Sequence, residues 1–142
     1  CTFKVRLIYA IVGICFGIMA GTCYGIMFQN VSATSMAFVS SIFAATSFYI
    51  HLAYKKKWMN NWTDSKWKSL FYINLILFII ATAGMAACCI LAGINHQGFT
   101  YDDLMGENLW MTAVWCFITA KWTGMSAYYA RWYLAKVKAA SL

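Results

Sequence analysis

The sequence predicts an all-α integral membrane protein, a four-helix bundle whose N- and C-termini both lie in the cytosol. Of its 142 residues, 63% are hydrophobic and 11% are charged, whereas soluble domains carry roughly 25% charged residues. Four apolar runs each reach the length of about 20 residues that a helix needs to cross a bilayer. These runs occupy most of the chain, so residues 1–142 are expected to form a single transmembrane domain.

The four expected spans cover residues 5–28, 34–54, 69–95 and 109–134. The first run is too long for the apolar core of a signal peptide and lacks a small-residue cleavage site, so we interpret it as a retained span. The chain contains no proline, and no span is therefore expected to carry a proline kink. Each span is consequently predicted to be a continuous helix.

A stripe of glycines follows one face of the first span, at Gly13, Gly17, Gly21 and Gly25. Small residues at a spacing of four allow two helices to approach closely. The stripe favours packing within one chain over a contact between protomers.

The loop charges predict the orientation. Basic residues concentrate at the two ends and in the central loop, namely Lys4, Arg6, Lys55, Lys56, Lys57, Lys66, Lys68, Arg131, Lys136 and Lys138. The third loop instead carries three acids, Asp102, Asp103 and Glu107, and no base. Because positive loops stay in the cytosol, both termini and the central loop are expected there. The net charge of +7 then reflects topology and attraction to the lipid bilayer, and we expect no nucleic-acid partner.

Neither the cysteines nor the tryptophans of the central loop indicate catalysis or a bound zinc ion. Five of the six cysteines fall within apolar runs, where they behave as small hydrophobic residues, and no Cys-x-x-Cys motif is present. Trp58, Trp62 and Trp67 lie among lysines, which predicts a short amphipathic segment on the cytosolic surface. We expect no enzymatic activity.

Two histidines, His51 and His96, are the only ones in the chain, and they fall at opposite ends of neighbouring spans. Neutral imidazole commonly ligates iron. The predicted topology separates them by roughly 25 Å, whereas axial nitrogens lie within roughly 2 Å of one metal. A bis-histidine cytochrome site within one chain is therefore excluded. Two open alternatives remain: His51 as a hydrogen-bonded structural residue, and His96 as an ordinary exposed loop residue.

Basic and aromatic residues of the last span add further candidates. Lys121 lies near its middle, where an unpaired charge is unfavourable, and no acid lies within any of the four runs. Near the cytosolic end, Tyr129, Arg131 and Tyr133 follow one another. A planar apolar molecule with a metal centre and anionic edges would engage all of these groups. Haem fits that description, while a bare divalent cation fits poorly without intramembrane carboxylates.

Through these residues the chain resembles a known family, the haem-responsive-gene haem transporters of solute carrier family 48. The resemblance rests on four segments in order: His51-Leu52-Ala53-Tyr54, His96-Gln97, Val114-Trp115-Cys116-Phe117-Ile118-Thr119-Ala120-Lys121-Trp122, and Tyr129-Ala130-Arg131-Trp132-Tyr133. It implies a four-span haem permease in which His51 and His96 handle haem iron. The family's terminal Phe-Ala-Arg-Lys-Tyr motif is matched at Ala130, Arg131 and Tyr133, whereas Tyr129 and Trp132 depart from it.

We therefore expect a haem transporter that moves haem from the exterior or an endolysosomal lumen to the cytosol. His96 would receive haem, His51 would ligate it next, and Tyr129, Arg131 and Tyr133 would accept it at the exit. Lys121 would face a propionate or a proton pathway. Haem is thus the substrate rather than a prosthetic group. Four helices are few to enclose it, which favours a homo-oligomer. We expect an endosomal or lysosomal membrane, or alternatively the plasma membrane. The alternative function is a non-transporting membrane scaffold.

Overall fold

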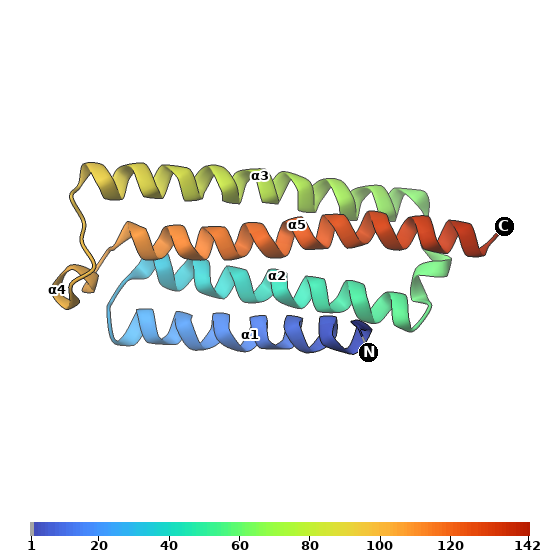
Figure 1. Cartoon of the computed structure of the whole chain (residues 1–142), viewed down its shortest axis with the longest axis horizontal. Coiled ribbons are helices and arrows are strands. Elements are labelled where there is room, and N and C mark those ends of the chain that lie inside the picture. The colour runs from blue at the N-terminus through green and yellow to red at the C-terminus, as the bar shows by residue number, and fades with distance from the viewer. Residues whose placement is uncertain (1) are drawn as a thin grey trace.

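The computed structural model describes residues 2–142, and Cys1 lies outside them. Four long helices make up nearly all of this region: α1 (Thr2–Ile26), α2 (Val31–Lys55), α3 (Asp64–Ile94) and α5 (Leu109–Ala140). Two single turns lie in the connections, the 3-10 helix η1 (Trp58–Asn61) and α4 (Tyr101–Leu104). The chain is all-helical, as the sequence predicts (Figure 1).

Each long helix overlaps one of the expected spans, although α1 ends two residues and α3 one residue before the expected span does. Capping residues explain where α2, α3 and α5 begin. The side chain of Asn30 accepts a hydrogen bond from the amide of Ala33, and Thr63 and Asn108 cap α3 and α5 in the same way. Three helices, α1, α2 and α3, are both long and apolar enough to cross a membrane, while α5 is equally long but less apolar. The lower apolarity of α5 reflects polar and charged residues along its length.

The helices form an open, twisted row in the order α1, α2, α5, α3, whereas the sequence led us to expect a bundle (Figure 1). Among residues 2–142, α1 packs on α2, α2 packs on α5, and α5 packs on α3. The two inner helices, α2 and α5, pack on their neighbours through small buried residues, including Ala37, Ala44 and Ser47 of α2. Large apolar side chains instead cover the outer faces of α1 and α3, where lipid can solvate them.

The four glycines of the stripe in α1 pack against other residues of the same chain. A Cβ at Gly17 would overlap the Ser41 hydroxyl and lie 2.8 Å from the Ala37 carbonyl oxygen, so a larger residue would separate α1 from α2. Gly21 lies against Phe38, and Gly13 lies against the indole of Trp122. The prediction that this stripe packs within one chain is confirmed.

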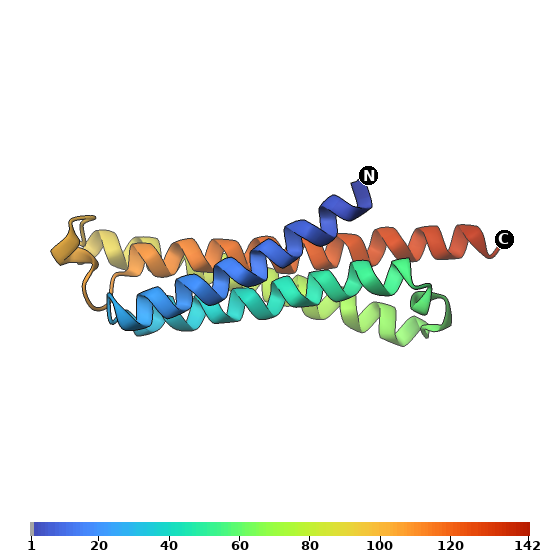
Figure 2. The same cartoon turned by 90° about the horizontal axis from the view of Figure 1, so that it is seen from below.

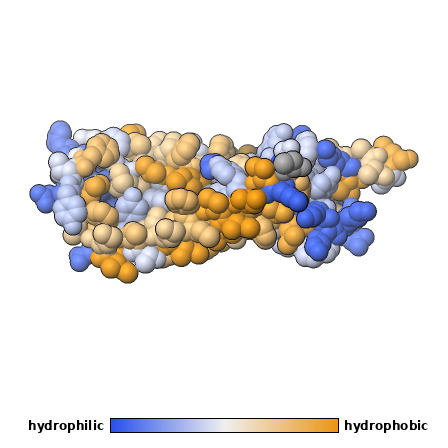
Figure 3. Space-filling model, turned by 60° about the horizontal axis from the view of Figure 1, so that its bottom comes forward, coloured by the Kyte–Doolittle hydropathy of each residue, from blue (hydrophilic) through white to orange (hydrophobic). Residues whose placement is uncertain are grey.

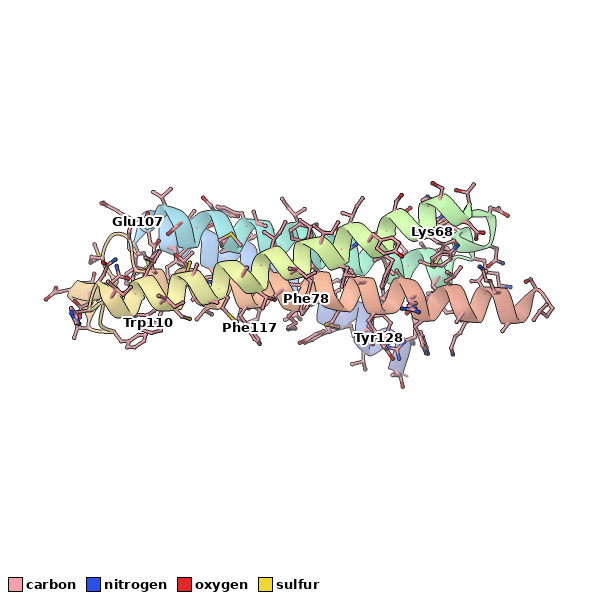
Figure 4. The ribbon with its side chains drawn as sticks, turned by 90° about the horizontal axis from the view of Figure 1, so that it is seen from above. Lys68, Phe78, Glu107, Trp110, Phe117 and Tyr128 are labelled. Carbon is pink, nitrogen blue, oxygen red and sulfur yellow. The ribbon has the colours of Figure 1, made fainter. Side chains whose placement is uncertain are left out.

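The two ends of the row differ in charge. Both termini lie at one end together with η1, and the α1–α2 turn and α4 lie at the other (Figure 1). Figure 3 shows hydrophilic residues at both ends and a largely apolar surface between them. Lys68 marks the basic end, and Glu107 and Trp110 mark the opposite end (Figure 4). The described termini therefore lie on the same side of the apolar zone.

Candidate functional site

His51 is buried near the end of α2 that lies beside η1, with only 1% of its surface exposed. Its Nδ1 atom is hydrogen-bonded to the hydroxyl of Tyr133, 2.7 Å away on α5. The Tyr129 ring meets the imidazole edge to face, with ring centroids 4.7 Å apart. Because Tyr133 engages Nδ1, the second ring nitrogen, Nε2, is the atom that could ligate a metal.

Tyr129 and Tyr133 reach His51 together because they are one helical turn apart and share a face of α5. Tyr133 is fully buried and stacks on Tyr54, with ring centroids 4.0 Å apart. Phe3 approaches the imidazole from α1, at 6.2 Å between centroids. We call these residues, together with Arg6, the His51 cluster: Phe3, Arg6, His51, Tyr54, Tyr129 and Tyr133.

The cation of this cluster comes from α1. The guanidinium carbon of Arg6 lies 4.9 Å from the ring centroid of Tyr129 and 5.1 Å from that of Trp132. Arg6 is half-buried there, and a guanidinium over an aromatic face can still donate hydrogen bonds from the N–H groups at its edge. The sequence had suggested Arg6 only as a topology charge.

Arg131 lies on the other side of α5. It is two residues from both Tyr129 and Tyr133, which turns it roughly 200° around the helix. Its guanidinium carbon lies 5.6 Å from the ring centroid of Phe71 on α3. Arg131 also lines a hollow with Trp67 and Lys68. The structure thus brings Tyr129 and Tyr133 to His51 and leaves Arg131 apart.

Trp67 belongs to the packing around the His51 cluster. It is 3% exposed and shares an apolar core with Ile50, Met59 and Tyr133. Our expectation that Trp67 lies on the membrane surface is therefore wrong, because α3 begins at Asp64 and turns this side chain toward α5. The tryptophan helps to fix the position of Tyr133.

Lys121 lies in the middle of α5, between aromatic rings. Its Nζ atom is 4.5 Å from the ring centroid of Tyr9 on α1 and 4.7 Å from that of Trp122. All four acidic residues of the chain lie in loops or at a helix start, so none of them pairs with Lys121. Lys121 is a cation held by aromatic faces, which attract it without neutralising it.

His96 is exposed at the opposite end of the row, just after α3. Its backbone φ is +52°, a left-handed conformation that glycine normally supplies. The amide of His96 donates to the Gly93 carbonyl, and the amide of Gln97 donates to that of Ala92. This pattern of hydrogen bonds is a Schellman motif, which ends α3. His96 occupies its left-handed position, and its side chain projects from the end of the helix.

The loop that follows His96 is held by many hydrogen bonds. Gln97 donates to the Glu107 carbonyl and accepts from the Leu109 amide, which closes the loop over α4. The Glu107 carboxylate accepts from the amides of Val31 and Ser32 and from the Ser32 hydroxyl, and so binds this loop to the start of α2. His96 is therefore presented from an anchored loop.

The acids beside His96 do not assemble a metal site. Asp103 is committed to the Thr100 hydroxyl, and Glu107 caps α2. Within residues 2–142, no three His, Cys, Asp or Glu side chains are grouped so as to hold a metal ion.

Comparison with known proteins identifies relatives of this chain. The family model described as haem-transporter, endosomal/lysosomal, haem-responsive gene matches residues 68–122, from the start of α3 to Trp122. The heme transporter hrg-1 of Caenorhabditis elegans is 39% identical, over 94% of this chain and 69% of its own length. The chain belongs to the haem-responsive-gene (HRG) family. The C. elegans heme transporter hrg-4 is 34% identical over 99% of this chain and 85% of its own, and hrg-6 is 35% identical over 94% and 83%.

No solved structure matches this HRG protein significantly. Sequence reasoning selected His51, Tyr129 and Tyr133 and missed Arg6 as a member of the same cluster. The pair Phe3 and Arg6 is spaced to share one face of α1, but nothing in the sequence says which helix that face meets.

Proposed function

We propose that this HRG protein is a permease that carries haem across a membrane toward the cytosol. The observation that supports this most directly is the His51–Tyr133 hydrogen bond inside an aromatic cluster, in a chain whose relatives are named heme transporters. Histidines that ligate metals commonly donate their other N–H to an oxygen, which fixes the ring orientation. Tyr133 supplies that oxygen, and Nε2 of His51 ligates haem iron.

The proposed path has two histidine stations. His96 receives haem at the exoplasmic end, where it is exposed and projects from an anchored loop. His51 ligates haem near the cytosolic end, where Tyr133 orients the imidazole and Tyr129 packs on the porphyrin. Arg6 pairs with a propionate at this cluster, and Arg131 meets haem on its way out along the α3 side of α5. Lys121 lies between the two stations.

The proposed topology has four spans, with α5 as the fourth and both termini in the cytosol. The basic residues near Lys68 and the acidic residues near Glu107 lie at opposite ends of the row (Figure 4). The positive-inside rule then puts the basic end, with both termini, in the cytosol. Residues 1–142 then form one transmembrane domain. The family description supports an endosomal or lysosomal membrane, with the plasma membrane as the alternative.

A homo-oligomer is part of the same proposal. The row leaves α1 and α3 with broad apolar outer faces, such as that formed by Ile8, Phe16 and Met19 of α1. A second copy seated beside α1 would enclose haem in a space that one row leaves open to lipid. Cross-linking in native membranes tests this part independently of transport.

The function is tested by haem-dependent growth of a haem-auxotrophic cell. Cells that express the wild-type chain should grow on limiting haem, and His51→Ala and His96→Ala should each reduce growth at equal amounts of protein in the membrane. Ile80→Ala, at an exposed position on α3, provides the control. Equal growth with both histidine variants would remove these residues from the mechanism.

Haem binding is tested separately with purified protein in detergent. Added haem should shift its Soret band saturably, and loss of His51 or His96 should diminish the shift. A scaffold that does not transport would show no saturable shift. This outcome would favour the alternative function.

A further inference from the structure

A groove lies between α1 and α5, near the middle of both helices. Its walls are Tyr9, Gly13 and Phe16 of α1 and Trp115, Lys121 and Trp122 of α5, and it encloses about 200 Å³. Figure 2 shows α1 crossing α5 obliquely, and the indole of Trp122 bridges the two helices by packing against Tyr9 and Gly13. The groove is therefore open along the seam between α1 and α5.

Three buried polar atoms on one side of α5 have no hydrogen-bond partner in the described part of the chain. They are Nε1 of Trp115, Nε1 of Trp122 and Oγ of Ser126, and within residues 2–142 they are the only buried side-chain nitrogen or oxygen atoms that lack a hydrogen-bond partner. Spacings of seven and four residues align them on one face of the helix. A buried donor without an acceptor is unfavourable, and native structures hold few of them. Two of the three belong to residues that line the groove.

Lys121 adds a full positive charge to the same groove. It lies 12 residues after the first residue of α5, about 18 Å along the helix, so its side chain is too short to reach water at that end. No acid of the chain is near, because all four lie in loops or at a helix start. Lys121 and the two tryptophans therefore line the same groove, and neither indole N–H group has an acceptor within residues 2–142.

The complementary ligand is an apolar molecule that carries a carboxylate. Charge-assisted hydrogen bonds from an ammonium and two N–H groups would stabilise such a carboxylate in a low-dielectric site. Tyr9 and Phe16 offer flat apolar contact beside it. A groove of this size is below the roughly 300 Å³ at which pockets for drug-sized ligands begin, so it holds one edge of a larger ring whose remainder faces lipid.

We propose that this groove binds the propionate edge of haem halfway across the membrane, with Lys121 pairing to one propionate and Trp115 and Trp122 donating hydrogen bonds. The inference rests on the proposed haem transport. Below the groove, Ser126 lies one turn beyond Trp122, and Tyr129 follows on the same face. The seam between α1 and α5 then joins the groove to the His51 cluster within one protomer.

The test uses metal-free protoporphyrin IX, which has the two propionates but no iron for a histidine to ligate. Its fluorescence should change saturably on binding to the purified full chain. Lys121→Gln should weaken binding about tenfold or more, the loss expected for one charge-assisted hydrogen bond. Lys121→Arg, which keeps the charge, should restore most of the affinity.

Two controls isolate the contact between Lys121 and a carboxylate. Lys66→Gln removes another lysine that lies over an aromatic ring, at 4.1 Å from the Trp62 ring centroid but outside the groove, and should leave affinity unchanged. Protoporphyrin dimethyl ester lacks the charged carboxylates, so its weaker binding should be the same in wild type and in Lys121→Gln.

Equal protoporphyrin affinity in wild type and Lys121→Gln overturns the proposal for the groove. If haem still gives a His51-dependent Soret shift in that case, the proposed haem transport survives. Displacement of protoporphyrin by stoichiometric oleate, with dimethyl ester binding as tightly as the free acid, would assign the groove to a lipid carboxylate and also overturn it. Absence of binding by both haem and protoporphyrin rejects both proposals.

Discussion

Arg6 lies over the ring of Tyr129, with its guanidinium carbon 4.9 Å from the ring centroid. The contact joins α1 to α5, two helices whose backbones do not approach each other closely. Tyr129 also contacts the imidazole of His51. Only the Tyr129 ring therefore separates the positive charge of Arg6 from the imidazole. The first helix thereby contributes to a site that the sequence placed on α2 and α5 alone.

Arg6→Gln is expected to weaken haem binding at His51 several-fold more than Arg131→Gln. The guanidinium of Arg6 lies near the rings of Tyr129 and Trp132, whereas that of Arg131 lies over Phe71 on the α3 side. A charge-assisted hydrogen bond to a propionate contributes about 1.5–3 kcal/mol. Soret titrations of the two purified variants measure the difference. A larger loss with Arg131→Gln would assign the propionate contact to Arg131.

Tyr133→Phe is expected to lower haem affinity by about tenfold or more, the range typical of losing a group that orients a metal ligand. The change leaves Nδ1 of His51 buried without its partner. Tyr128→Phe is the matched control, because Tyr128 is 61% exposed on the same helix. A Soret titration compares them, and equal affinities would mean that Tyr133 does not orient His51.

His96→Gly should stabilise the fold while it impairs haem uptake. A non-glycine residue in the left-handed region costs about 1–2 kcal/mol, and His96 has a φ of +52°. Glycine relieves this strain and removes the imidazole. Thermal unfolding in detergent and haem-dependent growth provide the two readouts. Unimpaired growth with higher stability would show that His96 serves no transport role.

Glu107→Ala is expected to loosen the loop between α3 and α5. Its carboxylate accepts from two amides at the start of α2, where a negative charge typically contributes about 0.3–1 kcal/mol. Limited proteolysis of the loop should accelerate in this variant. Asp102→Ala, which removes an exposed acid from the same loop, should leave the rate unchanged. Similar rates in both variants would argue against the anchoring role.

Gly17→Ala should destabilise the chain, while Gly93→Ala should not. A Cβ at Gly17 meets Ser41 and the Ala37 backbone, so α1 and α2 must move apart, whereas a Cβ at Gly93 meets nothing within 4 Å. In a helix interior, alanine is favoured over glycine by about 0.8–1.0 kcal/mol. Thermal unfolding of both purified variants checks this contrast, and equal destabilisation would contradict the close contact at Gly17.

The helices themselves could be predicted because apolar length and loop composition are local properties. Their arrangement could not, since an outer face solvated by lipid and an inner face packed on protein are both apolar. Gly17 shows the limit: its spacing indicated a close contact, but only the structure identifies Ser41 and Ala37 as the neighbours. The open row replaced the expected bundle for the same reason.

The candidate site was predictable where helical spacing applied. Tyr129 and Tyr133 are four residues apart and reach His51 together, and the same rule turns Arg131 away. Arg6 escaped notice because the positive-inside rule already accounted for a basic residue near the start of the first span. The groove at Lys121 required the crossing of α1 over α5, which depends on contacts far apart in the chain.

The open row makes the surrounding lipid a neighbour of the groove. Because α1 packs on α2 and contacts α5 at the indole of Trp122, the tilt of α1 sets the width of the seam that contains Lys121. A helix adapts its tilt to the thickness of the bilayer, at a modest energetic cost. Membranes of different thickness would therefore set different widths for the same seam, and a change of compartment would adjust this protein without any change in its sequence.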